Sequence, residues 1–260
     1  MTAVLADVRA ENPIRHLEPK MDSGFAGKPV IGLITLSTDC ITEHELRCMA
    51  PADRIVISAT RIKTRNPLSV AILREHVGEI SSAVRLFDPV ESVSVFAYAC
   101  TSGSAVNSIE ALTTGVRDGG SQAPITAPMT GALAAFKELG IAKIAMLTPY
   151  PDEVTLFMRD HLRKSGIEAI SMGSFHFEVD YEMACIAPEA ILESAAALDD
   201  PRAQAVFLPC TGLRASSVIE PLEQRLGKPV VTAHQAMLWH ALRLSGSGIK
   251  LSHLGRLFGG

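Results

Sequence analysis

From Pro29 onward, short apolar runs alternate with longer stretches in which apolar residues recur every three or four positions. The short runs predict strands, and the amphipathic stretches predict helices. Strands and helices in alternation are typical of parallel sheets covered by helices on both faces. The expected strands are 30–36, 54–59, 92–97, 143–148, 168–172, 205–208 and 229–232. The expected helices are 68–87, 105–116, 130–139, 153–165, 188–197, 217–226 and 235–244.

The pattern repeats itself after roughly 110 residues. The apolar run 95–99 leads into a cysteine and a threonine, and the run 205–209 does the same. Two further pairs of segments match in the same order, 31–39 with 144–152 and 124–127 with 229–233. Strand-then-turn patterns common to all α/β units are the alternative explanation, but the conserved order and spacing favour a duplicated half.

We therefore expect an α/β fold made of two pseudosymmetric parallel-sheet lobes with the active site between them. The first lobe is expected at 28–127 and the second at 128–234. Residues 1–27 mix charge, proline and glycine without periodicity, which predicts a flexible N-terminal arm. Residues 235–260 are expected to form a C-terminal helix and tail that pack back on the first lobe.

Composition narrows the classes of function. A net charge of −4 argues against a general nucleic-acid binder. No apolar run approaches the roughly 20 residues of a membrane helix, and the N-terminus lacks the basic start and apolar core of a signal peptide. Five widely spread cysteines suit free thiols in a reducing compartment. We expect a cytoplasmic protein with neither nucleic acid nor membrane as a partner.

Two of the cysteines, Cys100 and Cys210, follow predicted strands at equivalent places in the two halves. The carboxyl ends of parallel strands line the crevice of an open α/β sheet, so facing halves would place these thiols on opposite walls of one cleft. Small polar residues follow at 101–104 and 211–212. Their backbone amides and a helix start near Ala105 predict a nest for a substrate carboxylate, and the same field favours a thiolate.

Two thiols on opposite faces of a carboxylate substrate suit a two-base proton transfer, in which one removes the α-proton and the other delivers a proton. A thiolate could instead add to an activated double bond. Neither chemistry requires a metal or an organic cofactor, and we expect none. Ordinary packing of small apolar residues is the alternative, and it is our interpretation of Cys40, Cys48 and Cys185. A Cys100–Cys210 disulfide is disfavoured by the expected compartment.

The chain from about Val30 to Leu244 resembles the aspartate/glutamate racemase superfamily, and within it the branch of maleate cis–trans isomerases and arylmalonate decarboxylases. The stretches TLSTDCITEHE (35–45), SFHFEVDYEMACI (174–186) and LPCTGLR (208–214) resemble ectoine-utilization racemase-like proteins most closely. In this branch the isomerases keep both cysteines and the decarboxylases only the second, so the resemblance favours an isomerase or racemase. It also implies a carboxylate site made by Thr101, Ser102, Tyr150, Thr211 and Gly212.

Three departures from the branch concern the substrate. Asp39 stands where maleate isomerases have asparagine; it could bind a substrate ammonium or orient a thiol, or it could simply cap the next helix. Maleate isomerases also have an asparagine near 180–182, where Tyr181 is the expected counterpart. Cys210 is followed by Thr-Gly rather than the Thr-His typical of glutamate racemases, which weakens that assignment.

The leading hypothesis is a cofactor-independent racemase or isomerase that acts on a small, amino-acid-type carboxylate by two-cysteine proton transfer. By resemblance alone, the reaction would belong to ectoine catabolism. One alternative is a maleate-type cis–trans isomerase that works through a covalent cysteine adduct. The other is a non-catalytic carboxylate-binding protein. The N-terminal arm and the apolar final helix further predict a homo-oligomer.

Overall fold

The computed structural model describes residues 14, 17–22, 24, 27–67 and 69–259. Two four-stranded sheets, parallel throughout, have the same order of strands relative to the chain, β2-β1-β3-β4 and β6-β5-β7-β8. The expectation of two pseudosymmetric α/β lobes is therefore confirmed. The strands are β1 (Val30–Leu36), β2 (Val56–Ile62), β3 (Val95–Tyr98), β4 (Ile125–Thr126), β5 (Lys143–Thr148), β6 (Glu168–Ser174), β7 (Ala205–Leu208) and β8 (Val230–Thr232).

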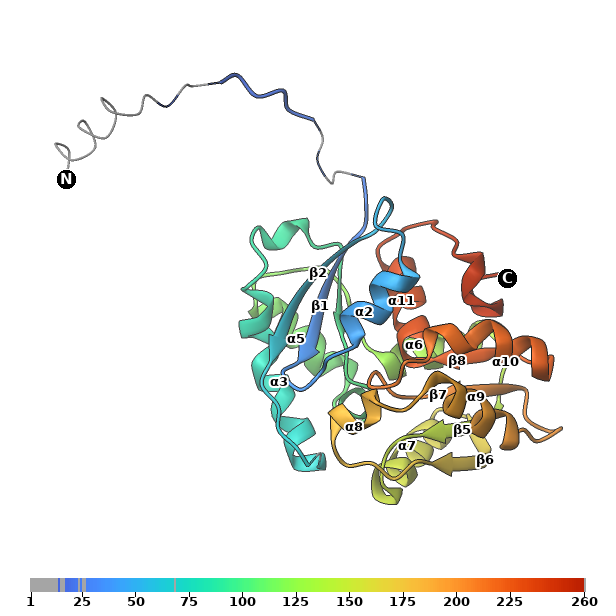
Figure 1. The fold of residues 1–260 in the computed structure, drawn as a ribbon. Helices are drawn as coiled ribbons and strands as arrows, with labels where there is room; N and C mark the ends of the chain where they lie inside the picture. The colour runs from blue at the N-terminus through green and yellow to red at the C-terminus, as the bar shows by residue number, and fades with distance from the viewer. Residues whose placement is uncertain (1–13, 15–16, 23, 25–26, 68, 260) are drawn as a thin grey trace.

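Helices cover both sheets and fill the space between them (Figure 1). In the first half they are α2 (Thr42–Met49), α3 (Val70–Val84), α4 (Thr101–Val106), α5 (Ile109–Asp118) and α6 (Pro128–Leu139). In the second half they are α7 (Asp152–Lys164), α8 (Asp180–Ala184), α9 (Pro188–Ala197), α10 (Ile219–Leu226) and α11 (Ala233–Leu244). Short 3₁₀ turns occupy Val90–Ser92, Ser216–Val218, Ser252–Leu254 and Arg256–Phe258.

The one helix expected over 105–116 is two helices. The first, α4, begins at Thr101, directly after Cys100, and ends at Val106. The second, α5, is capped by Ser108, whose hydroxyl accepts a hydrogen bond from the backbone amide of Ala111 at 3.2 Å. A serine in this role starts a new helix because it satisfies an amide that has no partner within the helix.

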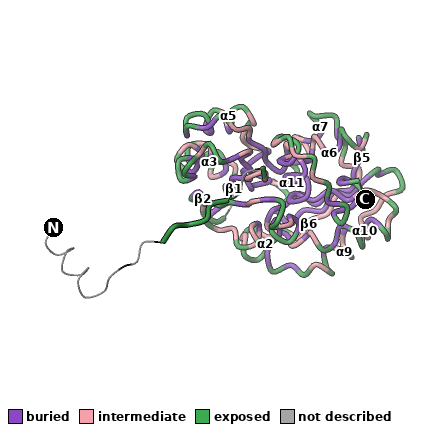
Figure 2. The backbone as a smooth tube through the Cα atoms, turned by 90° about the horizontal axis from the view of Figure 1, so that it is seen from above, coloured by how far each residue is buried: buried purple, intermediate pink, exposed green. Residues whose placement is uncertain are grey.

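The two lobes share a pair of helices. Helix α6 follows the first sheet and α11 follows the second, and the two pack against each other. They approach so closely at Gly131 that a Cβ atom there would lie 2.5 Å from the carbonyl oxygen of Ala236. Helix α11 also contacts α2, β3 and β4 of the first half. The central strands β3 and β7 are buried along their whole length. Figure 2 shows the buried segments gathered in the interior of the molecule.

The apolar character of α11 is satisfied within the chain, where nine of its twelve residues are buried. It therefore no longer argues for a subunit interface, and the homo-oligomer stays a prediction. Most of the expected N-terminal arm lies outside the described residues. The lobe boundaries at residues 127 and 234 also stay predictions.

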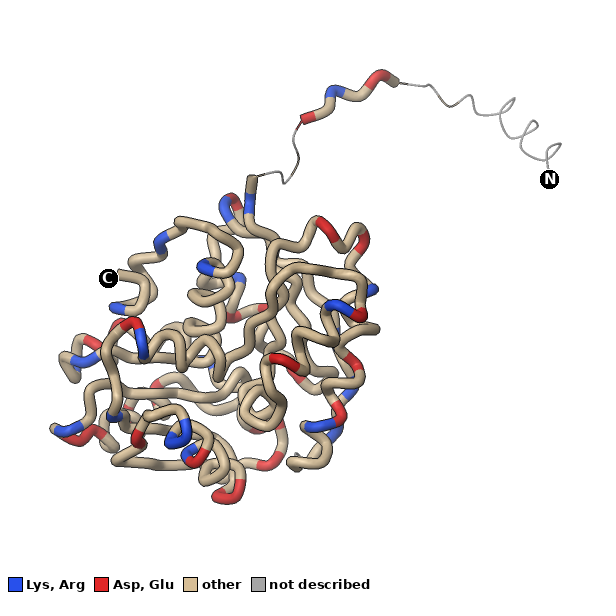
Figure 3. Tube along the Cα trace, turned by 180° about the vertical axis from the view of Figure 1, so that it is seen from behind, with Lys and Arg blue, Asp and Glu red and all other residues tan. Residues whose placement is uncertain are grey.

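Across the described part of the chain, no helix is both long and apolar enough to span a membrane. Basic and acidic residues are interspersed along the tube in Figure 3.

Candidate active site

The two cysteines occupy matching positions in the two lobes. Cys100 follows β3 and precedes α4, and Cys210 follows β7; each is only 3% exposed. Each sulfur accepts a backbone N–H from the turn that follows it, from Gly103 at 3.2 Å and from Gly212 at 3.1 Å. All five cysteines of the chain are free thiols.

A tyrosine hydroxyl lies within hydrogen-bonding reach of each thiol. Tyr98 approaches Cys100 from the same strand, two residues earlier, whereas Tyr150 approaches Cys210 from the end of β5. Burial raises the pKa of both phenols well above the ordinary value. Both tyrosines are therefore neutral hydrogen-bond donors at physiological pH.

Burial also raises the pKa of the thiols, to about 11 for Cys100 and about 12 for Cys210. The backbone amides and neighbouring hydroxyls lower these pKa values, as the sequence led us to expect, but the loss of water outweighs them. In this closed arrangement both cysteines are thiols at neutral pH. Forming the thiolate requires a change in the site, such as a bound substrate or a route for the proton to leave.

The walls of the site are tied together across the lobes. Thr42 on α2 donates to the carbonyl of Thr211 at 3.3 Å, and the hydroxyl of Thr211 donates to the carbonyl of Ala99 at 3.4 Å. Beneath them, Glu45 accepts the backbone N–H of Ser216 at 2.8 Å. These bonds hold the residues that flank each cysteine against the opposite lobe.

A small cavity of about 20 Å³ opens between the lobes beside the cysteines. That volume holds about one water molecule, so a substrate can enter only if the walls part. Its lining carries two carboxylates and, among the residues that the structure describes, no lysine or arginine. The lining residues are Leu36, Thr38, Asp39, Cys40, Ile41, Ala99, Asp180, Ala184, Thr211 and Gly212.

Asp39 stabilises the start of α2, one of the two roles considered from the sequence, and its binding of a substrate ammonium stays a prediction. Its Oδ1 accepts the backbone amides of Ile41 and Thr42, each at 2.9 Å, at the start of α2. Its Oδ2 is buried beside the cavity and has no hydrogen-bond partner among the residues that the structure describes. One oxygen stabilises the helix start, and the other is free to bind a ligand.

Asp180 is a site residue that the sequence did not reveal. It begins α8 beside the carboxyl end of β1 (Figure 1), and its carboxylate accepts a hydrogen bond from Thr38 in the other lobe. Burial and then the nearby Asp39 raise its pKa. Tyr181, the expected counterpart of the maleate isomerase asparagine, is 67% exposed and is not among the residues that line the cavity, so its correspondence stays a prediction.

The other predicted carboxylate ligands lie around the cysteines rather than on the cavity surface. Thr101 is 1% exposed, and its hydroxyl has no hydrogen-bond partner in the described part of the chain. The hydroxyl of Ser102 lies 3.7 Å from the sulfur of Cys100. Of the predicted ligands, Asp39, Thr211 and Gly212 line the cavity; Thr101, Ser102 and Tyr150 are buried near it.

The remaining cysteines do not form a site. Cys40, Cys48 and Cys185 are exposed, so our interpretation of them as buried packing residues was wrong. Cys48 contacts His44 at 3.6 Å. Within the described ranges, no group of three or more histidine, cysteine, aspartate or glutamate side chains is placed to hold a metal ion.

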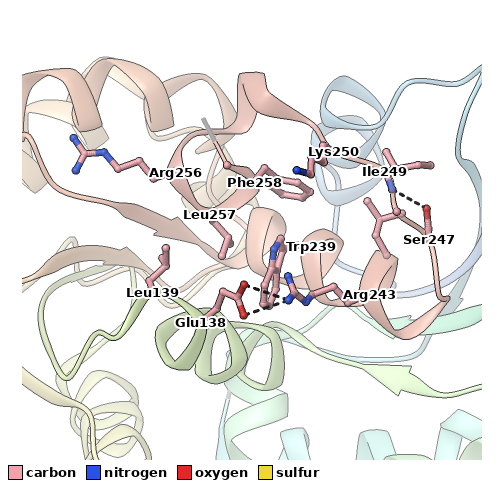
Figure 4. Close-up of a pocket in the computed structure, with 13 residues that line it drawn as sticks. Glu138, Leu139, Trp239, Arg243, Ser247, Ile249, Lys250, Arg256, Leu257 and Phe258 are labelled. Atoms are coloured by element: carbon pink, nitrogen blue, oxygen red, sulfur yellow. Dashed lines mark hydrogen bonds and ion pairs between the residues drawn. The ribbon is translucent and has the colours of Figure 1, made fainter.

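A larger hollow, about 480 Å³, lies between α6, α11 and the C-terminal segment (Figure 4). The guanidinium of Arg243 pairs with Glu138 at 3.2 Å and lies 4.4 Å from the ring centre of Trp239. None of the predicted site residues lines this hollow.

The fold and the paired thiols define a class of two-lobed α/β proteins with one buried cysteine after a central strand of each lobe. The chain belongs to the arylmalonate decarboxylase family, because a sequence model of that family matches residues 90–258, more than half of its length. The resemblance to the maleate isomerase and arylmalonate decarboxylase branch is thereby confirmed. The closer resemblance to ectoine-utilization proteins stays a prediction.

Individual relatives agree with this placement. The chain is 24% identical over 245 residues to a maleate isomerase from Alcaligenes faecalis, which covers 88% of this chain and 96% of the relative. It is 30% identical over 162 residues to the arylmalonate decarboxylase of Bordetella bronchiseptica. This match covers 60% of this chain and 65% of the relative. Its fold is similar to that of a Nocardia farcinica maleate cis–trans isomerase variant with a covalently bound succinylcysteine intermediate. The TM-score is 0.82 at 21% sequence identity, and the match covers 89% of this chain and 98% of the other.

Proposed function

We propose that this protein is a cofactor-independent isomerase that acts on a small carboxylate through Cys100 and Cys210. The observation that carries the proposal is the pair of buried thiols, one from each lobe, each placed directly after a central strand. Catalysis by two groups on opposite sides of one carbon requires this placement. The named relatives are enzymes, which gives the non-catalytic alternative no support.

The substrate carboxylate would bind beside Cys100, to Thr101, Ser102 and Tyr150, with the amides of Thr211 and Gly212 opposite. Within the described ranges the buried hydroxyl of Thr101 has no hydrogen-bond partner, so it is available for this role. Hydroxyl and amide donors stabilise a carboxylate more strongly as it takes on enolate character, because the site excludes water. That stabilisation is needed, since the α-proton of an amino acid is only weakly acidic.

Asp39 and Asp180 favour a substrate that also carries a positive charge. Both carboxylates line the cavity, and Asp39 has an oxygen without a partner. A dicarboxylate such as maleate would bring its second negative charge towards them, which disfavours binding. An ammonium group would instead be attracted. An amino acid fits this pattern, and the sequence resemblance makes a diaminobutyrate derivative the first compound to test.

In the proposed reaction one cysteine, as thiolate, removes the α-proton while the other, as thiol, delivers a proton to the opposite face. Both pKa values are raised by burial, so the proton must leave the first thiol before or during substrate binding. The ammonium group of the substrate would help, because a positive charge nearby favours the thiolate.

A maleate-type cis–trans isomerase is the second candidate. In that mechanism a thiolate adds to the double bond, the new single bond rotates, and the thiolate leaves. The succinylcysteine intermediate trapped in the Nocardia farcinica relative favours it. The two carboxylates at the cavity argue against it for this chain.

The two candidates are separated by incubation in heavy water, followed by proton NMR and chiral chromatography. A panel should contain both enantiomers of 2,4-diaminobutyrate, its Nγ-acetyl derivative and glutamate, with maleate as the contrasting acid. Racemase action predicts solvent deuterium at the α-carbon and loss of optical purity. Conversion of maleate to fumarate, with a mass-detectable cysteine adduct and no amino-acid exchange, would overturn the amino-acid proposal. The Cys100→Ser, Cys210→Ser double variant is the control.

A further inference from the structure

Behind Cys100 runs a buried line of polar groups that ends at the protein surface. The hydroxyl of Tyr98 lies beside the Cys100 sulfur, since a single Cβ atom on Gly103 would lie within 3 Å of both atoms. The same hydroxyl lies 2.6 Å from Nδ1 of His76. Nε2 of His76 lies 2.9 Å from the hydroxyl of Thr64. Tyr98 and His76 are 0% and 1% exposed, whereas Thr64 is partly exposed. The line therefore connects the thiol to solvent through the interior of the first lobe.

The residues of this line are held in place from several elements. His76 reaches in from α3, and Tyr98 from β3. Thr64 follows β2, where its backbone exchanges hydrogen bonds with the hydroxyl of Ser37 at 3.0 and 3.2 Å. A Cβ atom on Gly103 would lie 2.1 Å from the Tyr98 hydroxyl and 2.9 Å from the Cys100 sulfur, so only glycine leaves room for this contact.

Each group in the line can both donate and accept a hydrogen bond. Tyrosine and threonine hydroxyls do so, and a neutral imidazole does so through its two nitrogens. Burial lowers the pKa of His76 to about 4, which keeps the ring neutral and both tautomers available. All the hydrogen bonds along this line can thus exchange donor and acceptor together, while the tyrosine and the histidine both stay neutral.

We propose that Tyr98, His76 and Thr64 form a proton relay that exchanges the proton of the Cys100 thiol with solvent while the lobes stay closed. The proposal deepens the function proposed above and rests on it for its role in turnover. The Cys100 proton passes to the oxygen of Tyr98 as the Tyr98 proton passes to Nδ1 of His76. His76 releases its Nε2 proton to Thr64, and the Thr64 hydroxyl proton passes to water.

The step leaves a thiolate, a neutral tyrosine and the other neutral tautomer of histidine, with one proton in solvent. The reverse step returns the proton to the sulfur. A two-base enzyme needs such a step, because each turnover leaves the two thiols with their protonation states exchanged. The position equivalent to Tyr98 in the second lobe is Leu208, which cannot pass a proton.

The relay can be tested without any substrate, by infrared spectroscopy of the S–H stretch after transfer of the protein into heavy water. Cys100→Ser and Cys210→Ser variants assign the two buried thiols. We expect the Cys100 S–H to exchange at least about tenfold faster than that of Cys210. Tyr98→Phe and His76→Gln should each remove this advantage. Glutamine can keep hydrogen bonds at both ends but cannot switch tautomers as imidazole does.

His240→Gln is the matched control. His240 is half-buried and, like His76, contacts a threonine hydroxyl, that of Thr126 at 2.8 Å, but among the described residues no hydrogen bond links it to a cysteine. We expect this variant to leave both exchange rates unchanged. Thermal unfolding of every variant separates a loss of the relay from a loss of the fold.

Equal S–H exchange of the two thiols in the unmodified protein would overturn the relay, and so would full-speed exchange in a folded Tyr98→Phe protein. These results are independent of turnover. Failure of every amino acid on the panel, with the exchange difference intact, would instead overturn the proposed function. Where turnover is found, the relay further predicts that His76→Gln lowers kcat about tenfold with little change in KM.

Discussion

The surroundings of the two cysteines differ more than the duplicated fold would suggest. Both lobes place a thiol after a central strand and give its sulfur a backbone N–H. In the first lobe, Tyr98 lies behind the thiol of Cys100. Its hydroxyl contacts His76, which in turn contacts Thr64. In the second, Leu208 fills the equivalent position, and Tyr150 comes instead from a neighbouring strand. The two lobes thus share the position of the thiol, whereas the residues around each thiol give it a different proton environment.

The strongest test of the difference between Cys100 and Cys210 is to remove one thiol at a time. Cys100→Ser and Cys210→Ser should each lower racemisation about 10³-fold, because either loss removes a proton donor or acceptor. Each variant should retain some exchange of the α-proton from the remaining face. Proton NMR in heavy water, started from each enantiomer separately, measures this. Identical behaviour of the two variants towards both enantiomers would contradict the assignment of one cysteine to each face.

The carboxylates form the part of the site to which both lobes contribute equally. Asp39→Asn should weaken kcat/KM for ammonium-bearing substrates about 100-fold, because it removes the negative charge of the carboxylate whose Oδ2 has no hydrogen-bond partner among the described residues. Asp180→Asn should have a smaller effect, since its carboxylate is already bound by Thr38. Steady-state kinetics with an amino acid and with maleate provide the measurement. A gain for the amino acid in either variant would count against the ammonium site.

The glycines after the two cysteines offer a comparison in stability. Gly103→Ala should lower the free energy of unfolding by about 2 kcal/mol, because its Cβ would collide with the Tyr98 hydroxyl. Gly212→Ala should cost less than about 1 kcal/mol, since its Cβ would lie 3.3 Å from the Cys210 sulfur and 3.5 Å from Cβ of Met183. Urea unfolding followed by circular dichroism distinguishes them. Equal costs would mean that the first lobe is less crowded than this geometry indicates.

The smallest effect concerns pH. Burial lowers the pKa of His76 to about 4, below its value in the unfolded chain. The unfolded state therefore binds the proton first, and stability falls as the pH drops from about 6.5 towards about 4. Between about pH 8 and about pH 6, His76 should account for a loss of about 1 kcal/mol.

His76→Gln should remove this share of the acid sensitivity, as measured by urea unfolding at both pH values. The control is His240→Gln, because burial also lowers the pKa of His240. The His240→Gln variant should remove only the share of the acid sensitivity that is due to His240. In a double variant the two losses of acid sensitivity should add. A His76→Gln protein with unchanged acid sensitivity would show that His76 is solvated in the native state.

Much of the fold could be predicted because its signals are local. The strands predicted from the apolar runs 30–36, 143–148 and 205–208 have the same bounds as β1, β5 and β7. Each run is buried and is flanked by polar turns, which makes its ends visible in the sequence. Strand β4 was missed because two residues, Ile125 and Thr126, are too few to show a period. The break between α4 and α5 was missed because the apolar spacing continues across it, although Ser108 is a recognisable capping residue.

The site was predictable where it depends on repeated sequence and not where it depends on packing. Cys100 and Cys210 were found because they recur in equivalent contexts. Asp180 was not, because its position depends on how a five-residue helix rests against the other lobe. The contact between His76 and Tyr98 joins residues 22 apart on a helix and a strand, and only the packing of α3 on the sheet brings them together.

The close crossing of α6 and α11 has a consequence for how the site is assembled. Each lobe contributes its last helix to a shared seam, so half of the chain alone would leave an apolar helix face uncovered. A half-length protein of this kind would need a second copy, and its two thiols would meet only when the copies associated. Joining the halves makes that association intramolecular, with a fixed effective concentration. Both thiols therefore belong to one molecule at any dilution, and each is free to change its surroundings independently of the other.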